Sequence, residues 1–191
     1  EIAPDNAEGY ARLAQVRTAQ SNLEGAAAAF DNGLKVLPEN AQLLIGLAGV
    51  RERQQDYDAA ISRYEQVLEQ QPGNAISINN LAALLSDHRT DAASLDKAAE
   101  LAEKLEKTNQ PAFLDTAGWV YYRKGDYDKA LPILKRVVDE APQVPVFQYH
   151  LGMTYFQKGD KAAAKEHLTL ATAGDYSYQG IEEARATLES L

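Results

Sequence analysis

The chain has 191 residues, 45% of them hydrophobic, and carries a formal net charge of −9 at pH 7. Because the acidic residues are spread evenly and no basic face is offered, nucleic acid and anionic membrane surfaces are poor partners. No run of about 18 apolar residues is present, so no segment is expected to span a bilayer. The absence of cysteine excludes disulfides and thiolate chemistry.

Helix stop and start signals recur at a spacing of 34 residues, in the strings Pro4-Asp5-Asn6, Pro38-Glu39-Asn40 and Pro72-Gly73-Asn74. Proline ends one helix, and asparagine caps the next because its side-chain oxygen accepts a hydrogen bond from a free backbone N–H group. Between these signals, one position is occupied in register by Leu13, Leu47, Leu81, Ala117 and Leu151. A second position is always alanine, at Ala26, Ala60, Ala98, Ala130 and Ala164. The spacing predicts an all-α chain built from pairs of helices.

The segment Leu114–Pro142 shows the repeating unit most clearly, as two amphipathic stretches joined by a turn at Lys124-Gly125-Asp126. Glycine suits the end of the first helix and aspartate the cap of the second. The chain resembles the tetratricopeptide repeat family, which has a 34-residue period and the pattern W-x2-L-G-x2-Y…A-x3-F…P. In this segment the resemblance rests on Gly118, Tyr121, Ala130 and Pro142.

The resemblance implies a right-handed α-solenoid, with residues 1–191 forming a single array. We expect five units, at 7–40, 41–74, 75–110, 111–144 and 145–177, and a capping helix at 178–191 that covers the last apolar face. The string Glu1-Ile2-Ala3-Pro4 matches the end of a second helix, so we expect the chain to be part of a longer array.

Three features depart from a regular repeat. The third unit is two residues longer, and we place an insertion of about four at Asp87–Ser94, between its helices, and a shortened turn near Gln110-Pro111. Gln148 replaces a bulky apolar residue in the fifth unit, whose first helix is therefore expected to be shifted or loosely packed. Pro132 lies inside a helix and is expected to bend it slightly.

No catalytic, metal or cofactor site is expected. His88, His150 and His167 are not spaced three or four residues apart, as two ligands on one helix would be. The chain has no G-x-S-x-G and no phosphate-binding or dinucleotide-binding glycine motif. We therefore predict a protein that is not an enzyme and that binds another protein or a peptide segment.

The resemblance also implies that the first helix of each unit lines a concave binding groove. In the first two units the inward positions are small or polar and include Gln15, Thr18, Gly46, Gly49 and Arg53. Farther along the groove turns aromatic, because 11 of the 15 aromatic residues follow residue 110. Aromatic residues beside Arg and Met are typical of binding hot spots. The candidate site is Asn79, Asn80, Asp115, Trp119, Tyr122, Arg123, Tyr149, His150, Met153 and Phe156.

A structural interpretation of the same residues stays open. Trp119, Tyr122, Tyr149 and Phe156 fit equally well as packing residues between neighbouring units or against the capping helix. Gly46 and Gly49 fit either close approach of a partner or tight packing. The clamp for C-terminal carboxylates found in chaperone-binding members of the family is not expected, because the matching positions contain no lysine: Ala11, Gln15, Gly46, Ile76 and Asn80.

At a finer level, the strings S-I-N-N-L-A-A-L-L-S and L-D-T-A-G-W-V-Y-Y-R-K-G-D-Y are similar to bacterial cell-envelope proteins of this family. Those proteins are associated with exopolysaccharide export and PEP-CTERM protein sorting, which implies a scaffold for a secretion or polysaccharide apparatus. A self-associating structural array, and hence a homo-oligomer, is the alternative. RNA binding is disfavoured by the negative charge.

Overall fold

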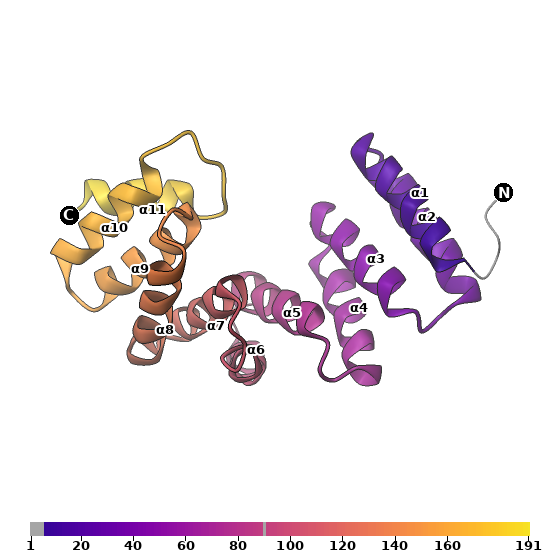
Figure 1. The fold of residues 1–191 in the computed structure, drawn as a ribbon, viewed down its shortest axis with the longest axis horizontal. Helices are drawn as coiled ribbons and strands as arrows, with labels where there is room; N and C mark the ends of the chain where they lie inside the picture. The colour runs from indigo at the N-terminus through magenta and orange to yellow at the C-terminus, as the bar shows by residue number, and fades with distance from the viewer. Residues whose placement is uncertain (1–5, 90) are drawn as a thin grey trace. The chain divides into compact units, whose positions relative to one another are not determined.

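The computed structural model describes residues 6–89 and 91–191, and every regular element in these two ranges is an α-helix (Figure 1). The helices are α1 (Ala7–Ala19), α2 (Leu23–Val36), α3 (Ala41–Arg53), α4 (Tyr57–Gln70), α5 (Ala75–His88), α6 (Ala92–Leu105), α7 (Pro111–Lys124), α8 (Tyr127–Glu140), α9 (Pro145–Gln157), α10 (Lys161–Thr172) and α11 (Ile181–Glu189). The predicted all-α solenoid of helix pairs is confirmed. The string Glu1-Ile2-Ala3-Pro4, interpreted above as the end of an earlier helix, lies outside the described residues.

Asparagine and aspartate begin most of these helices, as their positions in the sequence predict. The Asn40 Oδ1 atom accepts a hydrogen bond from the Leu43 N–H at 3.1 Å, and Asp126 Oδ1 accepts one from the Lys129 N–H at 3.2 Å. Gly125 ends α7 with φ at 83°, a left-handed conformation that glycine adopts without strain. The capping chemistry therefore sets where each helix pair turns.

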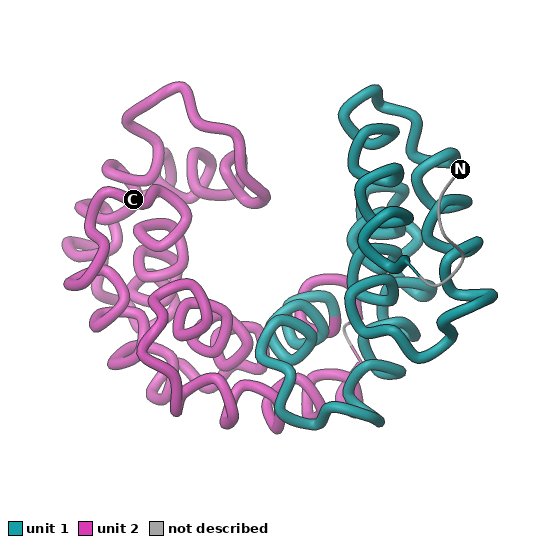
Figure 2. The backbone as a smooth tube through the Cα atoms, turned by 45° about the vertical axis from the view of Figure 1, so that its right-hand side comes forward, with its two compact units in different colours: residues 1–84 teal, residues 85–191 magenta. Residues whose placement is uncertain are grey.

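The chain divides into two compact units, residues 1–84 and residues 85–191, and the division falls within α5 (Figure 2). Each unit has its own hydrophobic core. In the first, Phe30, Leu43 and Leu47 pack with alanines of α1 and α2. In the second, an aromatic core around Trp119 and Tyr149 packs against α10 and α11.

Small residues let neighbouring helices approach closely, both within a pair and between successive pairs. A Cβ atom added to Gly118 would lie 2.6 Å from the Leu134 side chain, and one added to Gly46 would lie 2.3 Å from the Phe30 ring. Nothing lies within 4 Å of the position that a Cβ of Gly49 would occupy. Tight packing therefore explains Gly46 but not Gly49, which resolves the alternative that the sequence left open for Gly46.

The third helix pair accommodates its extra residues inside its helices. α5 ends at His88 and α6 begins at Ala92, so three residues separate them, as three separate α1 from α2. The insertion instead adds about one turn to the start of α6. At the other end α6 stops early, at Leu105, and five residues lead to α7 where four join α2 to α3. The insertion therefore lies within Asp87–Ser94, as expected, but it extends the helices rather than the connection between them, and the expected shortened turn near Gln110-Pro111 was wrong, because α6 ends early.

Gln148 is buried in α9 without loosening it. Its side chain is 2% exposed, its Nε2 donates to the Pro142 carbonyl at 2.7 Å, and its Oε1 lies 2.7 Å from His167 Nδ1. Because both ends of the amide have partners, burial costs little. The expected loose packing was wrong. Pro132 also leaves α8 continuous from Tyr127 to Glu140.

Candidate partner-binding site

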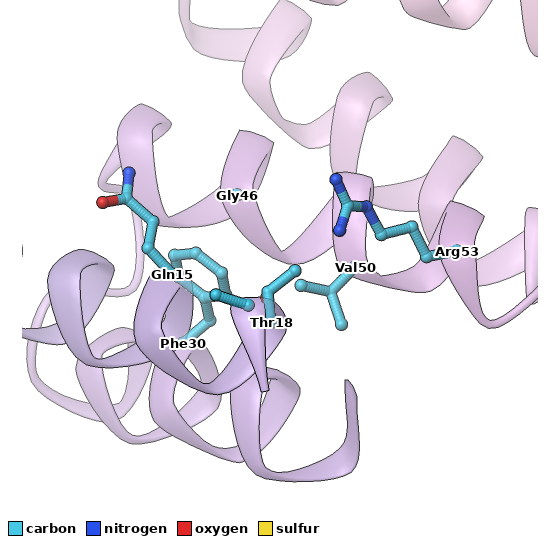
Figure 3. A pocket seen from close by; sticks show the side chains of 7 residues that line it. Gln15, Thr18, Phe30, Gly46, Val50 and Arg53 are labelled. Carbon is cyan, nitrogen blue, oxygen red and sulfur yellow. The ribbon is translucent and has the colours of Figure 1, made fainter. Parts of the chain in front are cut away.

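A cavity of about 450 Å³ opens beside α1 and α3 in the first unit (Figure 3). Its floor is apolar, formed by the buried side chains of Phe30 and Val50. Its rim is polar, with the exposed side chains of Gln15 and Arg53. The complete lining is Gln15, Thr18, Ala19, Phe30, Gly46, Val50 and Arg53.

The local sequence explains why an aromatic ring reaches this cavity. Phe30 comes from α2, the second helix of its pair, yet it lines a cavity otherwise formed by α1 and α3. Gly46 lacks a side chain where the ring lies, so the ring packs directly against the α3 backbone and its edge reaches the cavity floor. Val50 follows Gly46 by one helical turn and extends the apolar floor.

The arrangement suits binding rather than chemistry. Figure 3 shows Gln15 and Arg53 at opposite sides of the cavity, with Phe30, Thr18 and Val50 between them. None of the lining residues is a carboxylate or a histidine, so the cavity holds no acid–base pair. It combines apolar surface with two polar groups, which is typical of sites that hold a side chain of a ligand.

Sequence reasoning placed Gln15, Thr18, Gly46 and Arg53 on the inward surface but did not single them out. It left out Phe30, which follows Ala26 by one helical turn in the second helix of the first unit. The missed signal was the pairing of a glycine on α3 with a phenylalanine 16 positions earlier in the sequence, because a helix face without a side chain lets a large ring lie against it and reach the cavity floor.

The sequence-predicted aromatic residues come together in the second unit, and most of them are buried. Trp119 is only 7% exposed and Tyr149 only 2%, and Met153 is buried with them. The Trp119 ring stacks on His150, with centroids 4.0 Å apart, and on Tyr122, at 4.4 Å. These contacts correspond to the packing interpretation, which the sequence left as an alternative.

Hydrogen bonds fix this aromatic core. Trp119 Nε1 donates to Asp87 Oδ1 at 2.9 Å, and the Tyr149 hydroxyl donates to Glu183 of α11 at 2.6 Å. Burial, followed by the Glu183 hydrogen bond, raises the pKa of Tyr149. His150 Nδ1 lies 2.9 Å from both oxygens of the buried Asp115 carboxyl. Burial raises the pKa of Asp115, and the adjacent His150 opposes that shift.

The other predicted site residues retain exposed surface. Tyr122, Arg123 and Phe156 are partly exposed, and the Arg123 guanidinium lies 3.7 Å from Asp87. Asn79 and Asn80 belong to the first unit, where the Asn80 amide donates to the Tyr64 hydroxyl at 2.8 Å. That hydroxyl in turn donates to Glu52 at 2.6 Å.

Within residues 6–89 and 91–191, no group of three or more His, Cys, Asp or Glu side chains is placed to hold a metal ion. In the same ranges no helix has the length and apolar character that crossing a membrane requires.

Structures of known proteins share this fold. A tetratricopeptide repeat protein from Parabacteroides merdae superposes with a TM-score of 0.78 at 16% identity, covering 98% of this chain and 73% of that one. PilW, described as a type IV pilus biogenesis factor, superposes with a TM-score of 0.77 at 18% identity. The match covers 96% of this chain and 87% of the PilW chain. YrrB, described as a TPR protein with an unusual peptide-binding site, superposes with a TM-score of 0.71 at 21% identity. The match covers 98% of this chain and 93% of YrrB.

Comparison with models of protein families assigns the chain to a family from its sequence alone. Models described as tetratricopeptide repeat match residues 11–75, 50–112 and 121–179. A search of curated proteins found no match. Because the family models cover well over half of the chain, it belongs to the tetratricopeptide repeat family, whose members are generally protein-interaction scaffolds.

Proposed function

We propose that the chain is a non-catalytic scaffold that binds a segment of a partner protein across α1 and α3. The observation that carries this proposal is the cavity with Phe30 and Val50 as its floor. A large apolar side chain inserted there removes its own surface from water, at about 25 cal/mol per Å². The polar rim then restricts how the segment lies.

The residues first predicted from sequence support this proposal in a different role. Asp115, Trp119, Tyr149, His150 and Met153 are buried, so they supply a rigid framework for the second unit. Tyr122, Arg123 and Phe156 offer exposed surface, and we propose that they, with Asn79 and Asn80, are secondary contacts for a partner.

A display library of random 12-residue peptides, selected against the full chain, tests the proposal. Peptides with micromolar affinity are expected. The Ala19→Trp variant adds an indole to an exposed residue of the cavity lining and should weaken binding at least about tenfold. Ala28→Trp is the matched control, since Ala28 is an exposed position on α2 outside the lining. Equal affinity of both variants for the selected peptides would refute the cavity as the binding site.

At the level of pathway, we propose that the partner belongs to a bacterial secretion or exopolysaccharide apparatus. The supporting observations are the similarity to cell-envelope members of the family and a fold like that of the pilus biogenesis factor PilW. Proximity labelling in the source cell, with the Ala19→Trp variant as control, should recover export components in a cavity-dependent way. Labelling that is the same for both proteins would argue against this pathway.

Self-association is the competing function, and one observation favours it. Val16 of α1 is 55% exposed, the largest exposed fraction among the large hydrophobic side chains of residues 6–89 and 91–191, so a second copy could cover it. Light scattering over a hundredfold dilution separates the two functions. A mass that stays monomeric supports the scaffold, whereas a dimer that Val16→Ser dissociates supports the array.

A further inference from the structure

We infer that the α1–α3 cavity recognises an internal segment of a partner in which an apolar side chain neighbours an aspartate or glutamate. The apolar side chain enters the cavity, and Arg53 binds the carboxylate. This inference rests on the proposed function, because it specifies the chemistry of the segment that the scaffold holds.

Arg53 differs from the other basic side chains of its unit in having no partner. Among residues 6–84, Arg12 pairs with Glu8, Lys35 with Asn32, Arg51 with Asp31, Arg17 with the Gly25 carbonyl and Arg63 with Gln66. Arg53 makes no hydrogen bond or ion pair within the part of the chain that the structure describes, and its side chain is exposed. In a chain with a net charge of −9, an unpaired cation on a cavity rim is the one site there suited to an acidic group.

Nothing in the cavity competes with an incoming carboxylate. The lining contains no acidic side chain. The neighbouring Glu52 already accepts the hydrogen bond of the Tyr64 hydroxyl, and Arg51 is turned to Asp31 and Gln54. The planar guanidinium can offer two parallel N–H groups to one carboxylate, a geometry that lysine lacks.

The apolar floor and the cation together define a two-part ligand. The cavity volume of about 450 Å³ lies within the range of roughly 300–1,000 Å³ typical of ligand pockets. Phe30 and Val50 contribute apolar surface, and Arg53 follows Val50 by three residues on the same face of α3. Gln15, across the cavity, offers both a donor and an acceptor, which suits the peptide bond of a bound segment.

The test repeats the 12-residue display selection on the native chain and on three variants. Peptides selected on the native protein should contain an apolar residue within two positions of Asp or Glu several times more often than the starting library. Arg53→Gln should remove that enrichment, Arg53→Lys should keep part of it, and Lys35→Gln, which removes a positive charge of the same unit outside the cavity, should keep all of it.

Single synthetic peptides then test the contact itself. In an amidated peptide taken from the selection, Asp→Asn should weaken binding to the native chain by about five- to tenfold and leave binding to Arg53→Gln unchanged. Raising the salt concentration from 50 to 500 mM should reduce the difference in affinity between the Asp and Asn peptides for the native chain. It should not change that comparison for Arg53→Gln.

The outcomes separate the two proposals. Peptides that need the open cavity, shown by loss of binding to Ala19→Trp, but that have no acidic preference would overturn the inference and leave the scaffold proposal standing. An acidic preference that persists in Arg53→Gln, or binding that requires a free C-terminal carboxylate, would also overturn the inference. Failure to select any peptide that Ala19→Trp blocks would overturn both.

Discussion

Trp119 shows at the scale of one residue how a sequence-predicted contact residue becomes part of a core. Its indole N–H reaches Asp87, 32 residues earlier, and its ring lies against His150 on one side and Tyr122 on the other. A side chain held on both faces and at its polar edge has little surface left for a ligand. In this structure Trp119 is therefore a packing residue of the second unit.

Removing the acceptor of this tryptophan should destabilise the fold. Asp87→Ala leaves the buried indole N–H without its protein partner and is expected to lower the free energy of unfolding by about 1–3 kcal/mol. Asp96→Ala is the control, because Asp96 pairs with Lys124 on the exposed surface and should contribute less than about 1 kcal/mol. Urea unfolding followed by the single tryptophan measures both. Equal losses would show that the Trp119–Asp87 hydrogen bond adds nothing.

His167 makes the stability of the second unit depend on pH. Burial lowers its pKa from the ordinary value of 6.5, so the unfolded chain takes up a proton at higher pH than the folded chain. Between the two pKa values the unfolded state holds more protons, and stability therefore falls as the pH is lowered through 6.5. His167→Gln should remove this part of the dependence. The test is to measure the free energy of unfolding of the native chain and of His167→Gln from pH 7.5 to 5. An equal loss of stability in the two proteins would contradict the assignment to His167.

At the scale of the element, two glycines on one helix can have different structural roles. Gly46 and Gly49 are three residues apart on α3, but only Gly46 faces a neighbour, the Phe30 ring. The same residue type therefore allows close packing at one position and only weakens the helix at the other. Their contexts differ because Phe30 extends toward one of them and not toward the other.

Alanine substitutions at these two positions should change stability in opposite directions. Gly46→Ala places a methyl group 2.3 Å from the ring and is expected to cost about 1–3 kcal/mol, since the ring must move. Gly49→Ala meets no atom within 4 Å and should stabilise the protein by about 0.5–1 kcal/mol through helix propensity. Thermal and urea unfolding measure both changes. A Gly46→Ala variant that is more stable than the native chain would show that the Phe30 ring moves aside at little cost in free energy.

At the scale of the whole molecule, the chain is two compact units with separate cores and an acidic exterior. Structures that share only 16–21% identity with this chain have the same fold, so the fold tolerates wide changes in sequence. In this chain the helix pairs are set by the capping residues and by the small residues where helices meet. The remaining surface is free to vary, which is how a repeat scaffold changes its partner without changing its architecture.

The sequence by itself determined the helix pairs, their turns and the small residues between them. Capping hydrogen bonds at Asn40 and Asp126, and close packing at Gly118, depend on residues near in sequence or one repeat apart, so a regular spacing predicts them. The absence of cysteine and the negative net charge also follow from the sequence alone.

Only the tertiary structure decided which aromatic side chains are buried and where a cavity remains. A helical period identifies the face on which Trp119 or Phe30 lies, but it does not say how deep that face is covered by the next helix. Both rings are buried, Trp119 under α9 residues and Phe30 against the bare backbone at Gly46, but only the edge of Phe30 forms the floor of a cavity. Burial depends on the volumes of neighbours that are distant in sequence, and spacing alone does not contain that information.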